Sequence, residues 1–295
     1  MQIQSKSGLK MKVIAFAIQK GGQGKTTTAL HAGYWGLEIG ERVLFVDLDP
    51  QNAKTNLDSE FLINTVESAA VGNLSGTLRD LAFSNGLEVP EDAAVASGIM
   101  DENDHRKPAY FDQNGAFIQV DSRLASLHFD VDTFRKKLLI ARKKFEDYAQ
   151  DFDVCIIDTG PGNIYPLIMA MSLADIVIAP CTMDDNAIAG LDSLTANLLE
   201  VRRKIGSGFN LAPLGILPNK INRTRTRHMQ SLALLRESAW GGHVLPVELY
   251  DRGAIEESST RAVWRTQRGE SSSSVAAMEM VDACKCIYKL VDLGE

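Results

Sequence analysis

The sequence predicts an α/β fold in which a mostly parallel, twisted sheet is covered by helices on both faces. Two observations predict it: buried apolar runs alternate with helical stretches, and a glycine-rich loop joins the first run to the first helix. A chain of 295 residues that is 45% hydrophobic can bury a large core. We therefore expect a single domain over residues 1–295, beginning with a polar tail over 1–10.

The expected strands are short apolar runs, and the expected helices lie between or after them. The run "KVIAFAI" (12–18) is the first strand, and a helix follows from about Lys25 to Glu38, where Gly40 stops it. The further strands are "RVLFVDLD" (42–49), "DVCIIDT" (153–159), "DIVIAP" (175–180) and "LAPLGILP" (211–218). The further helices are expected near 132–149, 186–204 and 225–238, with a C-terminal helix over 275–292 that follows the serines at 271–274.

Charge is distributed unevenly along the chain, whose formal net charge is -7. Residues 51–115 carry four basic and eleven acidic side chains, whereas residues 201–270 carry twelve basic and six acidic ones. The acidic, turn-rich stretch 83–115 has no clear period, and we expect it to be a surface insertion. The basic stretch can form a local face for polyanions on an acidic protein.

The stretch "IQKGGQGKTTT" (18–28) predicts a phosphate-binding loop. Gly24, Lys25 and Thr26 fill the last three positions of the pattern G-x-x-x-x-G-K-[ST], although Gln19 stands at the first glycine. Backbone N–H groups that open a helix form a cradle for phosphate, with Lys25 at the β- and γ-phosphates and Thr26 at Mg²⁺. The alternative is a turn that binds nothing, but the strand before and the helix after favour a nucleotide. The residues expected at the nucleotide are Gly21, Gly22, Gln23, Gly24, Lys25, Thr26 and Thr27.

Carboxylates follow two of the predicted strands. Asp47 and Asp49 end the second strand, and Asp158 ends the run "CIID". Ligands of open α/β sheets lie at the carboxyl ends of the strands, and a charge delivered there by a buried run is unfavourable unless it is used. Such aspartates often cap helices or turns instead. Beside the loop, they favour a magnesium-nucleotide site with Thr26, Asp47 and Asp158 at the metal.

Lys20 is a second lysine in the loop, and Lys25 already serves the subunit's own nucleotide. A cation supplied by another subunit can neutralise the transition-state charge of phosphoryl transfer. We therefore interpret Lys20 as a residue that reaches the nucleotide of a second subunit. The alternative is a lysine exposed to solvent in a loop.

The motifs resemble those of one protein family. "KGGQGKTTT" resembles the deviant Walker A loop of the ParA/MinD family of ATPases, "RVLFVDLDPQNAKTN" its second motif and "DFDVCIIDTGPG" its Walker B strand. "PCTMDDNAIAGLDSL" (180–194) and "DRGAIEESS" (251–259) extend the resemblance over most of the chain. It implies a P-loop NTPase fold that forms a nucleotide-sandwich homodimer around ATP and Mg²⁺.

The resemblance also implies roles for single residues. Lys20, Lys25 and Asp49 would be catalytic, with Lys20 at the partner's nucleotide and Asp49 orienting the attacking water. Asp158 would hold magnesium through water, supported by Asp47. Asn219 would read adenine, with Pro246 to Leu249 on the other side of the base. The chain departs from the family's D-x-P-P ending at Gly160, which stands where the first proline is usual.

The basic stretch predicts a DNA-binding face, and members of the ParA branch bind DNA nonspecifically. The expected contacts are Lys220, Arg223, Arg225, Arg227 and Arg252, the last at a position where ParA proteins place a DNA-contacting arginine. Such side chains meet phosphates without reading bases. The alternative is a solvated helix face.

The predicted function is that of a ParA-type ATPase for DNA partition or cargo positioning, stimulated by a ParB-like or other cargo adaptor protein. The stretch 83–115 is a candidate docking surface for that adaptor. One alternative is a MinD-like membrane ATPase, but the last residues, "CKCIYKLVDLGE", are not a basic amphipathic helix. Others are an enzyme of the same fold acting on a small substrate and a nucleotide-dependent scaffold. Four cysteines without zinc-site or disulfide spacing favour a reducing cytoplasm. The resemblance to the ParA branch implies a nucleoid-associated protein, and no membrane contact is expected.

Overall fold

The computed structural model describes residues 11–53, 73–161, 164–184, 190–196, 199, 203, 212–256, 258, 261–265 and 271–293. These residues contain a seven-stranded sheet of order β3-β4-β2-β5-β1-β6-β7, in which β3 runs antiparallel to β4 and the other pairs are parallel. The strands are β1 (Lys12–Phe16), β2 (Val43–Leu48), β3 (Ala109–Tyr110), β4 (Gly115–Ile118), β5 (Val154–Thr159), β6 (Ile176–Thr182) and β7 (Leu214–Asn219). The five strands predicted from the sequence are thus confirmed.

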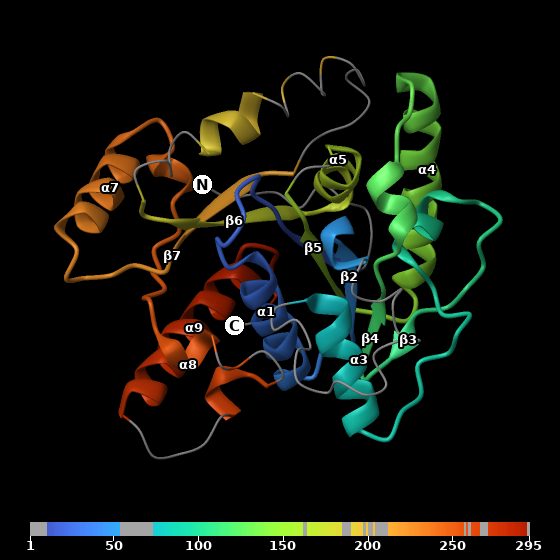
Figure 1. Ribbon diagram of the computed structural model, residues 1–295, viewed down its shortest axis with the longest axis horizontal. Coiled ribbons are helices and arrows are strands. Elements are labelled where there is room, and N and C mark those ends of the chain that lie inside the picture. Colours follow the sequence, from blue (N-terminus) through green and yellow to red (C-terminus); the bar gives the residue numbers. More distant parts are fainter. Residues whose placement is uncertain are drawn as a thin grey trace.

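Helices cover both faces of the sheet (Figure 1). The α-helices are α1 (Lys25–Glu38), α3 (Leu74–Ser84), α4 (Val131–Tyr148), α5 (Ile164–Leu173), α7 (Thr226–Glu237), α8 (Gly253–Glu256) and α9 (Ser271–Lys289). Short 3₁₀ turns occur at η1 (Pro50–Asn52), η2 (Ala96–Met100), η3 (Ser122–Ser126), η4 (Gly241–His243) and η5 (Val263–Arg265). The expected tail over 1–10 and most of the helix expected over 186–204 lie outside the described residues.

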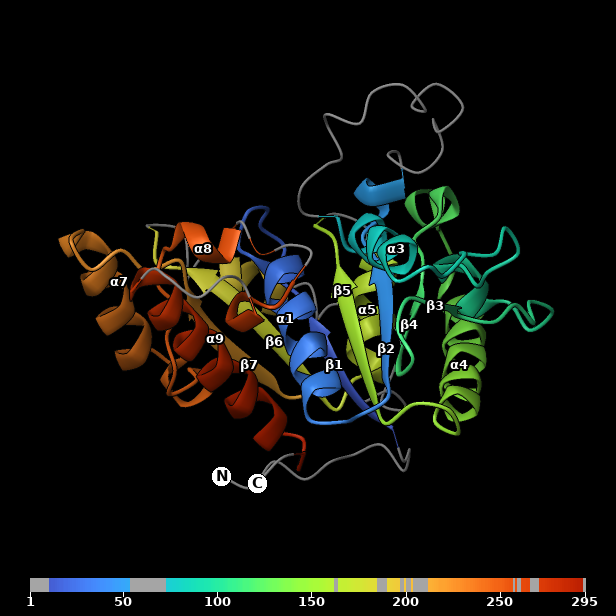
Figure 2. The same cartoon turned by 90° about the horizontal axis from the view of Figure 1, so that it is seen from below.

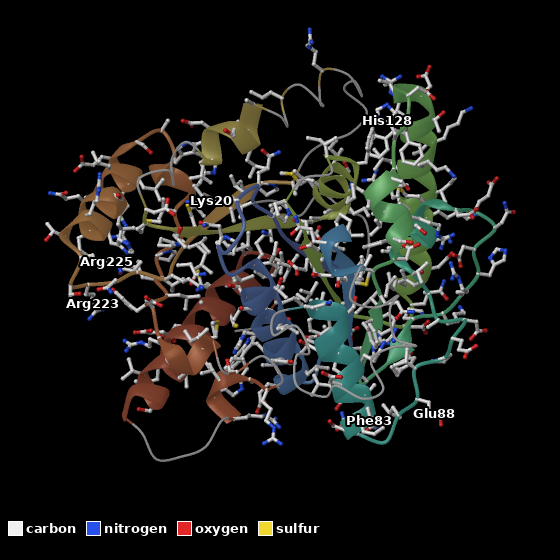
Figure 3. All side chains as sticks on the ribbon, viewed as in Figure 1. Lys20, Phe83, Glu88, His128, Arg223 and Arg225 are labelled. Carbon is white, nitrogen blue, oxygen red and sulfur yellow. The ribbon has the colours of Figure 1, made fainter. Side chains whose placement is uncertain are left out.

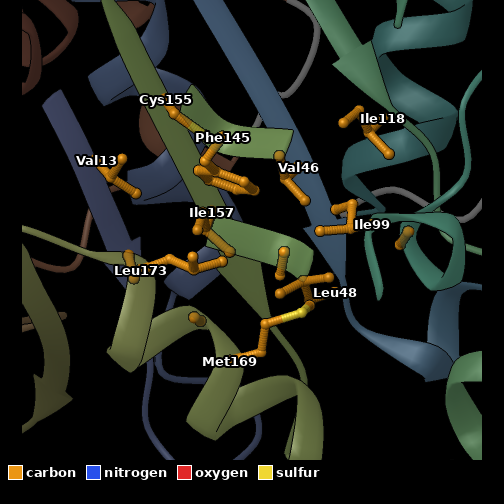
Figure 4. Close-up of a cluster of buried hydrophobic side chains, with 14 of the residues drawn as sticks. Val13, Val46, Leu48, Ile99, Ile118, Phe145, Cys155, Ile157, Met169 and Leu173 are labelled. Atoms are coloured by element: carbon orange, nitrogen blue, oxygen red, sulfur yellow. The ribbon is translucent and has the colours of Figure 1, made fainter. Parts of the chain in front are cut away.

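Alternate residues of each strand point to opposite faces of the sheet, which gives the protein two main cores. Val13 and Ala15 of β1 belong to a cluster with α4 and α5, whereas Ile14 and Phe16 belong to a cluster with α1, α3 and α9. Figure 2 shows the strands between these two helical layers, and Figure 4 shows side chains of the first cluster around Phe145. Both faces are therefore covered, as expected for parallel strands.

Helix α1 lies close to the sheet because it carries a glycine at the contact. A Cβ atom at Gly33 would lie 1.9 Å from Cζ of Phe45 on β2. The lack of a side chain at Gly33 therefore lets α1 pack closely against β2.

The stretch 83–115 was expected to be a surface insertion, and the structure corrects this expectation. Residues 83–88 are exposed, but Ala93, Ala96, Ile99 and Phe111 are buried, and β3 extends the sheet. The stretch therefore belongs partly to the core. Ala96 and Ile99 lie in a 3₁₀ turn, whereas Ala93 and Phe111 lie outside the helices and strands, so no element there is long enough to show a period.

Other elements also differ from the expectation. No pattern in the sequence indicated α3, α5 or β4, and β4 has only four residues, all buried. The C-terminal helix begins at Ser271, so the four serines lie inside α9 rather than before it.

Candidate nucleotide site

The loop between β1 and α1 has the geometry of an anion cradle. Gly22 and Gly24 have φ values of +73° and +83°, in the left-handed region that favours glycine. Gly24 is also the N-cap of α1 and has no side chain to cap the helix, so the first N–H groups of α1 remain available to an anion. A Cβ atom at Gly24 would lie 2.4 Å from Nδ2 of Asn219, which makes glycine necessary there.

Gln23 ties the loop to the sheet. Its side-chain oxygen accepts hydrogen bonds from the backbone N–H and the hydroxyl of Thr182, both at 2.8 Å, at the end of β6. Its backbone oxygen accepts a 2.7 Å bond from Nδ2 of Asn219, at the end of β7. The loop is thus held by the carboxyl ends of two strands.

The register of the sheet brings the predicted carboxylates to the loop. Asp47 lies opposite Asp158 in the pairing of β2 with β5, and the hydroxyl of Thr26 donates a 2.6 Å bond to Oδ2 of Asp158. Oδ1 of Asp158 is buried, and no donor among the described residues bonds to it. Burial, and after it the charge of Asp47, raises the pKa of Asp158 to about 8.

These groups fit a magnesium ion. Mg²⁺ is bound through oxygen ligands, usually one or two carboxylates together with water and substrate phosphate. The Thr26 hydroxyl and a buried carboxylate oxygen that lacks a donor supply such oxygens beside the phosphate cradle. A bound cation would also favour the ionised form of Asp158.

Asp47 is surrounded by protein donors. Its Oδ2 accepts from the N–H and the hydroxyl of Ser75, at 3.0 and 2.6 Å, and its Oδ1 accepts from the N–H of Asp49 at 3.0 Å. Burial raises its pKa to about 6, against the effect of these bonds. Asp47 therefore joins β2 to the start of α3 and orients the chain at Asp49, which agrees with a supporting role. Ser75 carried no signal in the sequence, because its place depends on how α3 packs.

Asp49 and Lys25 complete the centre of the site. Asp49 is almost buried, and its Oδ1 accepts a 3.0 Å bond from the N–H of Gln51. Burial lowers the pKa of Lys25, while the charges of Asp158 and Asp49 oppose this shift, so the ammonium lies near both carboxylates. A Cβ atom at Gly160 would lie 2.0 Å from Oδ1 of Asp49. The departure at Gly160 thus makes room for the Asp49 carboxylate.

Lys20 has a different surrounding. Its ammonium forms an ion pair with Asp184, just beyond β6, and Oγ1 of Thr182 lies 3.0 Å from the same carboxylate oxygen. The side chains of Lys20 and Asp184 are 36% and 41% exposed, whereas Lys25 is buried. The two lysines of the loop therefore differ in both partner and exposure.

A narrow cavity lies beside the cradle, at the start of α1. It is lined by Gly24, Thr27, Thr28, Asn219, Lys220, Tyr250, Asp251, Arg252, Ile255 and Met280. Oδ1 of Asn219 accepts from the N–H of Lys220 at 2.9 Å. Pro246 is exposed and is not among the lining residues, in place of which the structure brings Tyr250 to Arg252.

The five basic residues expected at DNA do not share one environment. Arg223, Arg225 and Arg227 are exposed around the start of α7, and Figure 3 shows the first two at the outer side of the molecule. The guanidinium of Arg223 lies 3.9 Å from the ring centre of Tyr250. Lys220 is half-buried, and Arg252 forms an ion pair with Glu279 of α9. Three of the five side chains are therefore exposed to solvent, whereas Arg252 is partly buried in its ion pair with Glu279.

Together, the glycine loop at the start of α1, the strand-end carboxylates and the parallel sheet define a P-loop nucleotide-binding protein. No helix in the described part of the chain is long and apolar enough to cross a membrane. A family model described as an AAA domain matches residues 11–211.

Among curated relatives, Protein IncC of Escherichia coli is 30% identical over 273 residues, which is 90% of this chain and 66% of that protein. A second IncC is 28% identical over 88% of this chain and 64% of its own length, so the chain spans slightly less than two thirds of these relatives. The chromosome-partitioning ATPase Soj of Thermus thermophilus is 31% identical over 70% of this chain and 69% of Soj. The chain belongs to the family that the model describes, and these relatives identify that family as the ParA/MinD ATPases.

Solved structures support the fold. The ATP complex of a McdA variant from Cyanothece has a TM-score of 0.71 and 18% identity, covering 98% of this chain and 99% of that one. A plasmid partition protein from Borrelia burgdorferi has a TM-score of 0.62 and 17% identity, with 93% and 97% of the chains covered.

Proposed function

We propose that this chain is a ParA-type ATPase that positions DNA or another cargo. It binds ATP with Mg²⁺, forms an ATP-dependent homodimer, binds double-stranded DNA without sequence preference, and hydrolyses ATP when a ParB-like or other cargo adaptor engages it. The proposal places it in the cytoplasm, on the nucleoid. Relatives named for partition and for carboxysome distribution support the class of function, and the nature of the cargo would then depend on the adaptor.

The residues of the site divide the chemistry between them. The N–H groups at the start of α1 and Lys25 bind the phosphates, while Thr26 and Asp158 hold Mg²⁺. Bound Mg²⁺ supplies charge that neutralises the phosphoryl oxygens. Asp49, held beside Lys25 by its bond to Gln51, orients the attacking water.

The observation that carries the proposal is the separation of the two lysines. Lys25 lies under the loop beside Asp49 and Asp158, whereas Lys20 is part-exposed and paired with Asp184. A lysine displayed at the rim of a nucleotide site is available to a second subunit facing it. If the ammonium of Lys20 leaves Asp184 and contacts the nucleotide of the second subunit, binding of ATP would favour dimerisation.

The proposal is tested by binding to random-sequence duplex DNA without nucleotide, with ADP and with ATP, at two salt concentrations. Wild type is expected to bind when ATP is present and to lose affinity steeply with salt, because binding to phosphates releases counterions. Lys20→Ala is expected to abolish this binding. Lys143→Ala, at an exposed position of α4, makes the same change in charge and should behave as wild type. A wild type that binds no DNA in any nucleotide state would refute the DNA-binding function.

A further inference from the structure

The hydroxyl of Ser75 joins three parts of the chain that are distant in sequence. Ser75 lies in the first turn of α3 and is 1% exposed. Its hydroxyl donates a 2.6 Å hydrogen bond to Oδ2 of Asp47 on β2 and accepts a 3.0 Å bond from the N–H of Val120, just beyond β4. A hydroxyl has one proton to donate, and here that proton is committed to the Asp47 carboxylate.

The way α3 begins explains why this hydroxyl is available to Asp47. The first N–H groups of a helix have no partner within it, and a serine near the start often caps them. In α3 the N-cap is Asn73, whose Oδ1 accepts from the N–H of Gly76 at 3.1 Å. The N–H of Ser75 donates to Oδ2 of Asp47 at 3.0 Å, so one carboxylate oxygen accepts two bonds from the same residue. The Asp47 carboxylate is therefore bound to the start of α3.

Asp47 transmits this constraint to Asp49. While Ser75 holds Oδ2 of Asp47, Oδ1 of the same carboxylate accepts a 3.0 Å bond from the N–H of Asp49. Oδ1 of Asp49 accepts in turn from the N–H of Gln51 at 3.0 Å. Asp47 and Asp49 are 1% and 9% exposed, so protein groups rather than solvent set their orientation. The hydroxyl of Ser75 thus fixes how the Asp47 carboxylate is turned, and with it the backbone at Asp49.

We infer, resting on the role proposed for Asp49, that Ser75 is a positioning residue for ATP hydrolysis. Its hydroxyl holds the Asp47 carboxylate in the orientation that binds the N–H of Asp49, and so keeps the Asp49 carboxylate where it orients the attacking water. The phosphate cradle is built from a different part of the chain, the loop before α1. Loss of the hydroxyl should therefore reduce the rate of hydrolysis and leave the binding of ATP intact.

Ser75→Ala tests the inference through single-turnover hydrolysis of ATP and equilibrium binding of ATP. The rate should fall about tenfold, because a misplacement of about 1 Å at a reacting group can reduce a rate about 100-fold. The affinity for ATP should stay within about twofold of wild type, since the lost contact acts on the transition state. Ser84→Ala is the matched control: it removes a hydroxyl at the other end of α3, which donates to the carbonyl of Asp80, and should change neither quantity. A wild-type rate in Ser75→Ala would overturn the inference.

Two further measurements show whether the hydroxyl itself is responsible. Ser75→Thr keeps the hydroxyl and should recover most of the rate. Amide hydrogen exchange over residues 48–52, without nucleotide, should be faster in Ser75→Ala and close to wild type in Ser75→Thr, because the N–H of Asp49 is protected by its bond to Asp47. A lost rate in both variants with unchanged exchange would mean that packing around Ser75 is responsible, and would overturn the inference.

A double-mutant cycle tests whether Ser75 acts through Asp47. In an Asp47→Ala protein there is no carboxylate to orient, so adding Ser75→Ala should lower the rate by less than about twofold more. A full further loss, as large as in the wild-type background, would show that Ser75 acts independently of Asp47 and would overturn the inference. Thermal unfolding near the wild-type temperature shows that each variant retains the fold.

Asp49→Asn separates failure of this inference from failure of the proposed function. If Asp49→Asn loses hydrolysis and Ser75→Ala does not, only the positioning role is overturned. A wild-type rate in Asp49→Asn would refute the role proposed for Asp49, and the inference with it. DNA enters none of these measurements, so a protein that hydrolyses ATP and binds no DNA would refute the DNA-binding function alone.

Discussion

The phosphate site and the basic face around α7 differ in what surrounds their polar side chains. Those of the site are held by hydrogen bonds inside the protein, whereas those of the basic face are exposed to solvent. Asp47, Asp158 and Thr26 lie where β2, β5 and α1 meet, and short hydrogen bonds inside the protein hold them. Arg223 and Arg225 lie on an exposed surface. The difference teaches that strand register fixes the chemistry of the site, whereas contacts between distant segments determine which surface charges are displayed.

The largest expected effect separates the two lysines of the loop. Lys25→Ala should weaken ATP binding by about 100-fold, because a contact to a charged group contributes about 1.5–3 kcal/mol. Lys20→Ala should leave ATP affinity within about threefold of wild type and abolish partner-stimulated turnover, since its proposed role is at the other subunit's nucleotide. Equilibrium binding of ATP and steady-state hydrolysis measure the two effects. An equal loss of ATP affinity in the two variants would contradict the separate roles of Lys25 and Lys20.

Gly160→Ala tests how closely Asp49 is positioned. The added Cβ would lie 2.0 Å from Oδ1 of Asp49, so the carboxylate must move. The rate of ATP hydrolysis should fall at least about tenfold, because misplacing a reacting group by about 1 Å can reduce a rate about 100-fold. Nucleotide affinity should change little.

Gly242→Ala is a matched control for this change, since a Cβ atom there has no neighbour within 4 Å. It should retain the wild-type rate. A Gly160→Ala enzyme with wild-type turnover would show that Asp49 tolerates displacement, and would count against its role in orienting water.

The pH dependence of stability tests the buried Asp158. Because its pKa is raised from 3.8 to about 8, the nucleotide-free folded protein retains a proton that the unfolded chain releases. This stabilisation is fully present below pH 3.8 and is lost as the pH rises to about 8 and beyond. Asp158→Asn cannot ionise, so its unfolding temperature at pH 8 should exceed that of wild type by at least about 2 °C, or about 1 kcal/mol.

Thermal unfolding at several pH values, without nucleotide or magnesium, measures this difference. Asp47 remains in both proteins and contributes a similar but smaller dependence, since its pKa is raised to about 6. Parallel curves for wild type and Asp158→Asn would mean that the pKa of Asp158 in the folded protein is not raised above its value in the unfolded chain.

The sequence allowed most of the site to be predicted, and physical reasons explain the rest. Asp47 and Asp158 could be placed because parallel strands end at one edge of a sheet. Ser75 could not, because its bond to Asp47 depends on the packing of α3 against β2. The pairing of Arg252 with Glu279 joins residues 27 apart on different elements, and no local pattern indicates it.

The fold shows the same division. Strands β1, β2, β5, β6 and β7 were predicted because each is a continuous apolar run, and α1 because a glycine loop opens it. The edge of the sheet was missed because β3 and β4 have two and four residues, too few to distinguish a strand from a turn by periodicity. The stretch 83–115 is acidic overall because of the exposed residues that precede β3. This overall composition gave no sign of the buried residues within the stretch.

The smallest expected effect belongs to a single arginine of the basic face. Arg225 is exposed at the start of α7, and its removal should take away one phosphate contact. In Arg225→Ala, the slope of log affinity against log salt should become shallower by about 0.9, with affinity reduced a few-fold. Binding of the ATP-bound protein to duplex DNA over a range of salt concentrations measures this slope.

The control for this arginine lies in the other helical layer. Arg142→Ala, on the exposed side of α4, removes the same charge there and should leave the slope unchanged. If both variants changed the slope equally, DNA would respond to net charge rather than to the face around α7. The basic face around α7 would then have no specific role in DNA binding.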